Sequence, residues 1–301
     1  MSGMLSMTDV IADHSDLSAS DTLWLAGLVD QWDVLADLAF SDLILWVPDV
    51  DDNVFWAAAQ CRPTTGPTAL EDDVVGEDIA YDPESLVIEA YLSQEICATS
   101  GNKLHAGIPV DVHAVPILRE GRPIAVVEIH TNRMGVRAPG ALEDTYLETA
   151  TEMMEMVRTA HFPTPGDKPV PWGTPRVGDG SLRVDAGGVI TFASPNAMSA
   201  FRRLGWAGDL LGDRLPAILA SFQQGRREPV EEVAPPLLSD HRVRETELET
   251  SLGAMRVRSQ PLWRDGEPSG WFVTCRDVTD LRTRERELVT KDATIREIHH
   301  R

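Results

Sequence analysis

The sequence predicts an α+β protein of two domains, each an antiparallel sheet with flanking helices, followed by a C-terminal helix. Pairs of short apolar runs around turns occur in both halves of the chain, as in β-hairpins. Segments with apolar residues three or four positions apart accompany these pairs, as in amphipathic helices. Proline and glycine gather in 163–178, which we interpret as a linker. The domains are therefore expected at 1–162 and 179–278, and the terminal helix at 279–301.

The first domain is predicted to begin with a helix and to contain two hairpins. The helix has apolar residues on one face and is expected at 21–40. An Asp-rich turn separates the strands of the first hairpin, and Glu120-Gly121-Arg122-Pro123 forms the turn of the second. The four strands are expected at 43–47, 54–59, 110–117 and 124–130, and two further helices at 83–100 and 141–161.

The second domain is predicted to follow the order β-β-α-α-β-β-β. Its first hairpin surrounds the Ala186-Gly187-Gly188 turn, and Ser194 begins a helix that runs to about Leu204. The three later strands are expected at 245–250, 254–262 and 271–278.

The terminal helix carries a thin apolar seam. Leu281, Leu288 and Ile295 recur every seven residues, as in a short coiled coil. Glu285 and Asp292 occupy neighbouring seam positions, so little apolar surface is available. A helix of this kind is weakly stable alone, and we therefore expect a homodimer.

Composition limits the possible partners. The net charge is -21, and residues 1–100 contain twenty Asp or Glu against a single Arg, Arg62. Such a surface repels nucleic acid and anionic membranes, so neither is expected as a partner. No apolar run of about 20 residues and no signal peptide is evident. The three cysteines are widely spaced and odd in number, which indicates a cytoplasmic protein without a disulfide framework.

Several motifs resemble a known family. The stretch K-D-A-T-I-R-E-I-H-H-R resembles the start of the phosphoacceptor box of sensor histidine kinases, E-[IL]-x-H-R-V-K-N. The stretch V-x-x-V-P-I-L-R-E-G-R-P-I-A-V-V resembles the closing hairpin of a GAF domain. The stretches D-x-x-G-x-I-x-F-A-S-P-N-A and R-D-V-T resemble the start and end of a PAS domain. With W-x-x-L-A-D-L-A-F-S-D-L and A-Q-C-R-P-T-T-G-P-T, the chain resembles the sensory region of actinobacterial cytosolic two-component kinases of the PdtaS type.

The resemblance implies a phosphoacceptor and a partner. His300, directly before Arg301, corresponds to the histidine that receives the phosphoryl group, and His299 is the alternative. The chemistry requires a neutral imidazole nitrogen, which histidine supplies near neutral pH. The V-K-N continuation and the ATP-binding domain, with its ATP and Mg, are expected beyond Arg301. This part of the chain should therefore be inactive alone, and the longer kinase should pass the phosphoryl group to a response regulator.

Six residues are candidates for ligand contact. Arg62 could hold an anion through its planar guanidinium, or form an ion pair within the acidic shell. Cys61 could be a redox or metal-sensing thiol near His113, although no spacing typical of a metal site supports this and a structural thiol fits as well. Trp46 and Trp56, on facing strands, could line a pocket or fill the core. Asn196 could contact ligand or cap a helix.

The ligand stays open at this point, and so does the function. The resemblance allows a small molecule such as a cyclic nucleotide in the GAF-like domain, and no metal site is predicted. The alternative function is a non-catalytic GAF–PAS module for ligand binding or dimerisation, in which the terminal histidines play no part. In a third reading, a redox switch at Cys61 would be the signal that is sensed, and the control of the kinase would stay the same.

Overall fold

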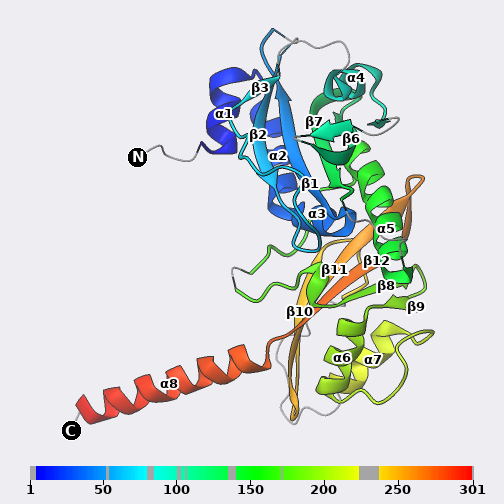
Figure 1. The fold of residues 1–301 in the computed structure, drawn as a ribbon. Coiled ribbons are helices and arrows are strands. Elements are labelled where there is room, and N and C mark those ends of the chain that lie inside the picture. Colours follow the sequence, from blue (N-terminus) through cyan, green and yellow to red (C-terminus); the bar gives the residue numbers. More distant parts are fainter. Residues whose placement is uncertain are drawn as a thin grey trace. The chain divides into compact units, whose positions relative to one another are not determined.

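The computed structural model of the chain divides into two compact units (Figure 1). Unit 1 is Met1–Pro163 with Trp263–Glu267, and unit 2 is Thr164–Leu262 with Pro268–Arg301. The structure describes residues 5–51, 54–79, 85–99, 103–105, 107–134, 140–170, 172–223 and 237–299. Each unit is described by itself below.

Unit 1 contains one antiparallel sheet with the strand order β3-β2-β1-β7-β6-β4, and β5 pairs with β6. Its helices are α1 (Met7–His14), α2 (Ala19–Gln31), α3 (Asp33–Ala39), α4 (Leu86–Ser93) and α5 (Ala141–Arg158). Its strands are β1 (Ser41–Pro48), β2 (Phe55–Cys61), β3 (Asp78–Ile79), β4 (Cys97–Ala98), β5 (Lys103–His105), β6 (Ile108–Arg119) and β7 (Arg122–Asn132).

Two predicted helices of unit 1 differ from the structure. The helix expected at 21–40 is divided into α2 and α3 at Trp32, and it ends because Phe40 adopts a left-handed conformation with φ 51°. The helix expected at 83–100 ends early, because Gln94 has φ 61° and Cys97–Ala98 pair with β6 as strand β4. Both ends are left-handed caps formed by residues other than glycine, which the sequence pattern did not predict.

Helix α4 covers one face of the unit 1 sheet. Its buried residues Val87, Ile88 and Ala90 join a core cluster with Trp46 and Val126. Successive strand residues point to opposite faces, so their neighbours in sequence face the other side. There α3 packs against β1 and α5 packs against β6.

Unit 2 is built on a five-stranded sheet with the order β10-β11-β12-β8-β9. Its strands are β8 (Ser181–Asp185), β9 (Ile190–Ala193), β10 (Arg244–Thr250), β11 (Gly253–Arg264) and β12 (Glu267–Asp277). Its helices are α6 (Pro195–Leu204), α7 (Leu215–Gln223) and α8 (Thr279–His299), and a 3-10 turn, η1, spans Val177–Asp179. Helices α6 and α7 lie together on one side of the sheet, and α8 begins directly after β12 (Figure 1). The two sheets with their helices confirm the α+β class.

Local chemistry explains the start of α6. The Ser194 side chain accepts a hydrogen bond from the Ala197 N–H, and Pro195 occupies the first helical position. Phe201 and Leu204 then face the core of unit 2. The helix ends at Gly205, with φ 111°.

Residues 164–170 and 172–176, here called the strap, belong to unit 2 and pack against the rest of it. Asp167 N–H donates to the Val243 carbonyl at 2.8 Å, and Val243 N–H donates to the Pro165 carbonyl at 2.9 Å. A Cβ atom at Gly166 would lie 2.1 Å from the Val243 oxygen, so only glycine allows this approach. The strap is therefore held beside the residue that precedes β10.

Candidate functional site

The two tryptophans of the first hairpin lie on opposite faces of the sheet. Trp46 pairs with Ala57, whereas Trp56 pairs with Val47. Trp46 is buried under α4, and the Trp56 ring stacks on His14 of α1 at 3.6 Å. Of the two readings of these rings, a shared pocket is therefore wrong, because adjacent pairs in a hairpin alternate between faces, and Trp46 fills the core.

A polar cluster on the α4 face was missed by the sequence analysis. It consists of Asp42, Trp46, Glu128 and His130, and the pairs Asp42–His130 and Trp46–Val126 place these side chains on the same face. Trp46 Nε1 donates to Glu128 Oε2 at 2.8 Å, and His130 Nε2 lies 3.0 Å from the same oxygen. Two polar residues at alternate positions of an otherwise apolar strand were the signal that could have revealed it.

Asp42 anchors the loop that follows β2. Its carboxylate is fully buried and accepts hydrogen bonds from the Thr68 hydroxyl at 2.7 Å and from the backbone N–H groups of Ala69 and Leu70. Asn132 Nδ2 donates to the Thr68 carbonyl at 2.9 Å. These bonds position the loop at the end of the α4 face.

Arg62 is engaged by the same loop. Its guanidinium donates to Asp73 Oδ1 at 2.9 Å and to the backbone oxygens of Leu70 and Glu71. The structure thus shows the ion pair that was one of the two readings of this residue. Contact between Arg62 and an anionic ligand stays a prediction, and it would require the ligand to compete with Asp73.

The candidate sensing residues of unit 1 do not gather around Cys61. The Cys61 thiol donates to Asp33 Oδ1 at 3.2 Å. Cys97 lies on β4, four strand positions from β2, which corresponds to about 19 Å. His113 lies on β6, opposite Ile129, and its Nδ1 is buried without a hydrogen bond among the described residues. Within the described ranges, no group of three or more His, Cys, Asp or Glu side chains could hold a metal ion.

We expect the three thiols to differ strongly in reactivity. Cys275 is fully buried, and this burial, with a smaller contribution from Asp179, raises its pKa to about 12. Its thiolate fraction is then about 1000-fold lower than that of an ordinary thiol, whereas Cys61 and Cys97 are partly exposed. Titration of the native chain with a thiol reagent should leave Cys275 unmodified until the protein unfolds. Fast modification of Cys275 in the native chain would contradict this, and an unreactive Cys61 would remove the redox reading.

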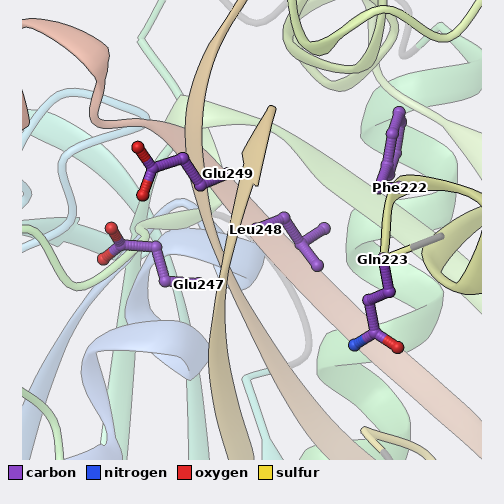
Figure 2. A pocket seen from close by; sticks show the side chains of 5 residues that line it. All are labelled: Phe222, Gln223, Glu247, Leu248 and Glu249. Carbon is purple, nitrogen blue, oxygen red and sulfur yellow. The ribbon is translucent and has the colours of Figure 1, made fainter. Parts of the chain in front are cut away.

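In unit 2, Asn196 and a small pocket beside β10 give little support for a ligand site. Asn196 is exposed and donates to the Gly178 carbonyl at 2.8 Å, while Ser194 caps the helix. A pocket of about 10 Å³, room for one water, lies between α7 and β10. Figure 2 shows Leu248 pointing toward Phe222, with Glu247 and Glu249 on the other side of the strand.

Several hydrogen bonds join the end of β12 and the start of β11 to the start of α8. Thr279 donates to Asp277 Oδ1 through its hydroxyl at 2.6 Å and through its N–H at 2.9 Å. The Thr279 hydroxyl also accepts from the Ala254 N–H at 3.1 Å, and Val278 N–H donates to the Ala254 carbonyl at 2.9 Å. The start of α8 is thereby fixed to the first residues of β11.

Opposite charges face each other on the surface of the sheet away from α6 and α7. Glu247 of β10 pairs in register with Arg256 of β11, and Arg256 Nη2 donates to Glu247 at 3.1 Å. Arg282, in the first turn of α8, donates to the same carboxylate from Nε at 2.5 Å and from Nη2. Burial opposes ionisation of Glu247, but the bonds from Arg282 and Arg256 hold its pKa below the usual value.

The predicted phosphoacceptor residues lie at the end of the described chain. His299 is the last residue of α8, and its side chain is not described. His300 lies outside the described residues. Leu288 is 63% exposed, so this seam residue makes no substantial contact within the chain.

Comparison with known proteins shows which proteins this chain resembles. The model for the GAF domain of the histidine kinase PdtaS matches residues 7–150. The sensor histidine kinase PdtaS of Mycolicibacterium smegmatis is 37% identical, over 99% of this chain and 60% of its own length. That of Mycobacterium tuberculosis is 35% identical, over 99% of this chain and 61% of its own length. The chain is a sensing region of the sensor histidine kinase type, similar to PdtaS over nearly its whole length.

A solved structure identifies which part of a PdtaS-type kinase this is. It is described as the sensor region of a sensor histidine kinase and matches with a TM-score of 0.74 and 29% identity, over 93% of this chain and 100% of that chain. Unit 1 contains the GAF domain of this sensing region. The chain spans about 60% of the length of the curated PdtaS relatives. None of the helices in the described ranges combines the length and apolar composition needed to cross a bilayer.

The charge on Glu247 is expected to make unit 2 of the PdtaS-type region acid-sensitive. A carboxylate whose pKa is lowered by folding stabilises the folded state above its unfolded pKa, near 4.5, and loses this effect as the pH falls through the folded value. Glu247→Gln should therefore lower the free energy of unfolding by about 1 kcal/mol at pH 7 and by much less near pH 3. Chemical unfolding at both pH values measures this, with the exposed Glu287→Gln as control. If Glu247→Gln lowered the free energy of unfolding equally at pH 7 and pH 3, the ionisation of Glu247 would not be the cause.

Proposed function

We propose that this sensing region controls ATP-dependent autophosphorylation of His300 in a longer chain. The observation that carries the proposal is the bonded junction at Thr279, since it fixes α8 to the sheet of unit 2 and α8 runs to within one residue of His300. The imidazole nitrogen attacks the γ-phosphorus of ATP, ADP leaves, and the phosphoryl group then passes to an aspartate of a response regulator. ATP and Mg would be held by a kinase domain outside this segment.

Three further features belong to the proposal. Unit 2 is a PAS-like domain, which its β-β-α-α-β-β-β order supports. The protein acts as a homodimer, because the exposed seam residue Leu288 of α8 needs a second copy to bury it. Its location is the cytoplasm. The partner is a response regulator, and nucleic acid and membrane are not partners.

The input is proposed to be a small molecule, such as a cyclic nucleotide, that acts on unit 1. The polar cluster under α4 offers ionisable and hydrogen-bonding groups at Asp42, Glu128 and His130 within an apolar surface. Such a ligand controls the kinase only if it binds two arrangements of the sensing region with different affinity.

Autophosphorylation from labelled ATP tests the output. The chain extended to its natural C-terminus is compared with His300→Gln and His299→Gln variants. Loss of label only in His300→Gln supports the proposal. Loss only in His299→Gln would move the phosphoacceptor to His299, and an unlabelled parent would favour the alternative, a non-catalytic module for binding or dimerisation.

The seam of α8 is expected to transmit the control. Leu288→Asp places a charge in the seam, while both units should stay folded because Leu288 is exposed. We expect the autophosphorylation rate of the extended Leu288→Asp chain to become independent of the sensing region, measured against the same chain starting at Thr279. Val289→Asp, at an exposed neighbouring position off the seam, is the control. Regulation that persists in Leu288→Asp would count against the seam.

A further inference from the structure

We propose that the strap and α8 are coupled directly through one shared carboxylate, that of Glu247. A displacement of the strap would then change the attachment of the output helix without passing through the core of unit 2. This proposal describes how a change in the strap reaches α8. It goes beyond the control of His300, because the coupling can be measured in this chain without any phosphorylation. Three sets of contacts carry it.

Arg256 joins the strap to Glu247. Its guanidinium is buried, with the whole residue 8% exposed, and Nη1 donates to the backbone oxygen of Trp172 in the strap at 2.8 Å. Nη2 of the same side chain donates to Glu247 at 3.1 Å. Because one rigid guanidinium bonds both Trp172 and Glu247, a shift toward one of them lengthens the bond to the other.

A second tie holds the strap farther along the same face. Arg258 Nη2 donates to the Asp167 backbone oxygen at 3.1 Å, and Nη1 donates to Glu245 at 2.8 Å. The Asp167 carboxylate accepts from the Glu245 N–H at 2.9 Å. Glu245 is opposite Arg258 in the strand pairing, so the strap follows the row of charges on β10 and β11.

Arg282 and Arg286 attach α8 to the same row. Arg282 donates to both oxygens of Glu247, and Arg286 donates to Glu249. Arg282 also pairs with Glu285 on its own helix. Arg282 therefore joins the sheet to its own helix, and the bond to Glu285 would still hold its side chain on α8 if the bonds to Glu247 were lost.

The strap also approaches α8 sterically. Gly173 has φ +89°, and a Cβ atom there would lie 3.1 Å from Arg256 Nη1 and 3.3 Å from Leu281 Cδ2. The strap thus lies between the arginine that holds it and the first turn of α8. A shift of the strap must move Arg256, Leu281 or both, and moving Arg256 disturbs the carboxylate that holds Arg282.

Peptide-resolved hydrogen exchange of the chain tests the coupling. Gly173→Ala should displace the strap and accelerate exchange of the α8 amides at 283–290 by about fivefold, the effect of losing roughly one such contact. Gly212→Ala is the matched control, because Gly212 has a similar φ of +83° and no atom within 4 Å of the added Cβ. Exchange in α6 and β8 should stay unchanged and reports whether unit 2 remains folded.

A second pair of variants tests the carboxylate itself. Arg256→Lys keeps the charge but lacks the rigid pair of donors that bonds Trp172 and Glu247 together, and it should accelerate α8 exchange as Gly173→Ala does. In an Arg282→Gln background both changes should have little further effect, because the attachment of α8 through Glu247 is already lost, while those at Arg286 and Thr279 remain. Equal effects of Gly173→Ala and Gly212→Ala on α8, or full additivity with Arg282→Gln, would overturn the coupling. Neither result depends on whether His300 is phosphorylated.

Discussion

Asp42→Ala is expected to lower the free energy of unfolding of unit 1 by about 3 kcal/mol, because a buried acceptor of several hydrogen bonds is lost. The carboxylate is fully buried and accepts from Thr68, Ala69 and Leu70. Its removal leaves these donors without the acceptor while they remain enclosed. Chemical unfolding followed by hydrogen exchange in β1 and β7 measures the change.

Asp111→Ala is the control for this effect. Asp111 lies on β6 of the same unit and pairs with Arg133, which is 51% exposed. Exposed ion pairs contribute little, so this variant should lose about 0.5 kcal/mol. Asp42→Asn, which keeps one acceptor oxygen, should lie between the two. If Asp42→Ala were no more destabilising than Asp111→Ala, Asp42 would not anchor the loop.

Thr279→Val is expected to loosen the start of α8 by about 2 kcal/mol while the core of unit 2 stays folded. Valine has nearly the same shape but offers no hydroxyl, so the Ala254 N–H loses its acceptor and Asp277 loses a donor. Burial opposes ionisation of Asp277, and the Thr279 bonds lower its pKa. The pKa of Asp277 should therefore rise in the variant.

The conservative variant distinguishes the hydroxyl from the shape. Thr279→Ser keeps the hydrogen bonds and should show nearly parental exchange at the start of α8, whereas Thr279→Val should exchange about 30-fold faster. Gly253 leaves the space for this hydroxyl, since a Cβ there would lie 2.6 Å from Thr279 Oγ1. Equal exchange in the serine and valine variants would show that packing, not hydrogen bonding, holds the junction.

The elements that the sequence predicted well are those with a strong local pattern. The hairpins of unit 1 and the hairpin around Gly187 and Gly188 were placed to within a few residues. Alternating or continuous apolar runs bounded by turn residues decide such strands locally. The helix end at Gln94 was missed, because a left-handed conformation of this residue type leaves no sequence signal.

The candidate site was harder to predict because it depends on which strands become neighbours. Trp46 and Trp56 are ten residues apart, and only the register shows that they face opposite sides. His130 and Glu128 lie beside Trp46 through the pairing of β1 with β7. Arg62 has many acidic residues near it in the sequence, and only the structure shows that its partner is Asp73.

The sequence by itself determined the α+β class, most of the strands, the charged terminal helix and the motifs of the sensor kinase family. It could do so because hydrophobic periodicity and turn chemistry act between near neighbours. Only the tertiary structure decided which charges meet. Arg282 reaches Glu247 across 35 residues and Asp42 reaches Leu70 across 28, and such pairs carry no local signal. Their identity follows from strand order and register, which the whole unit determines when it buries its core.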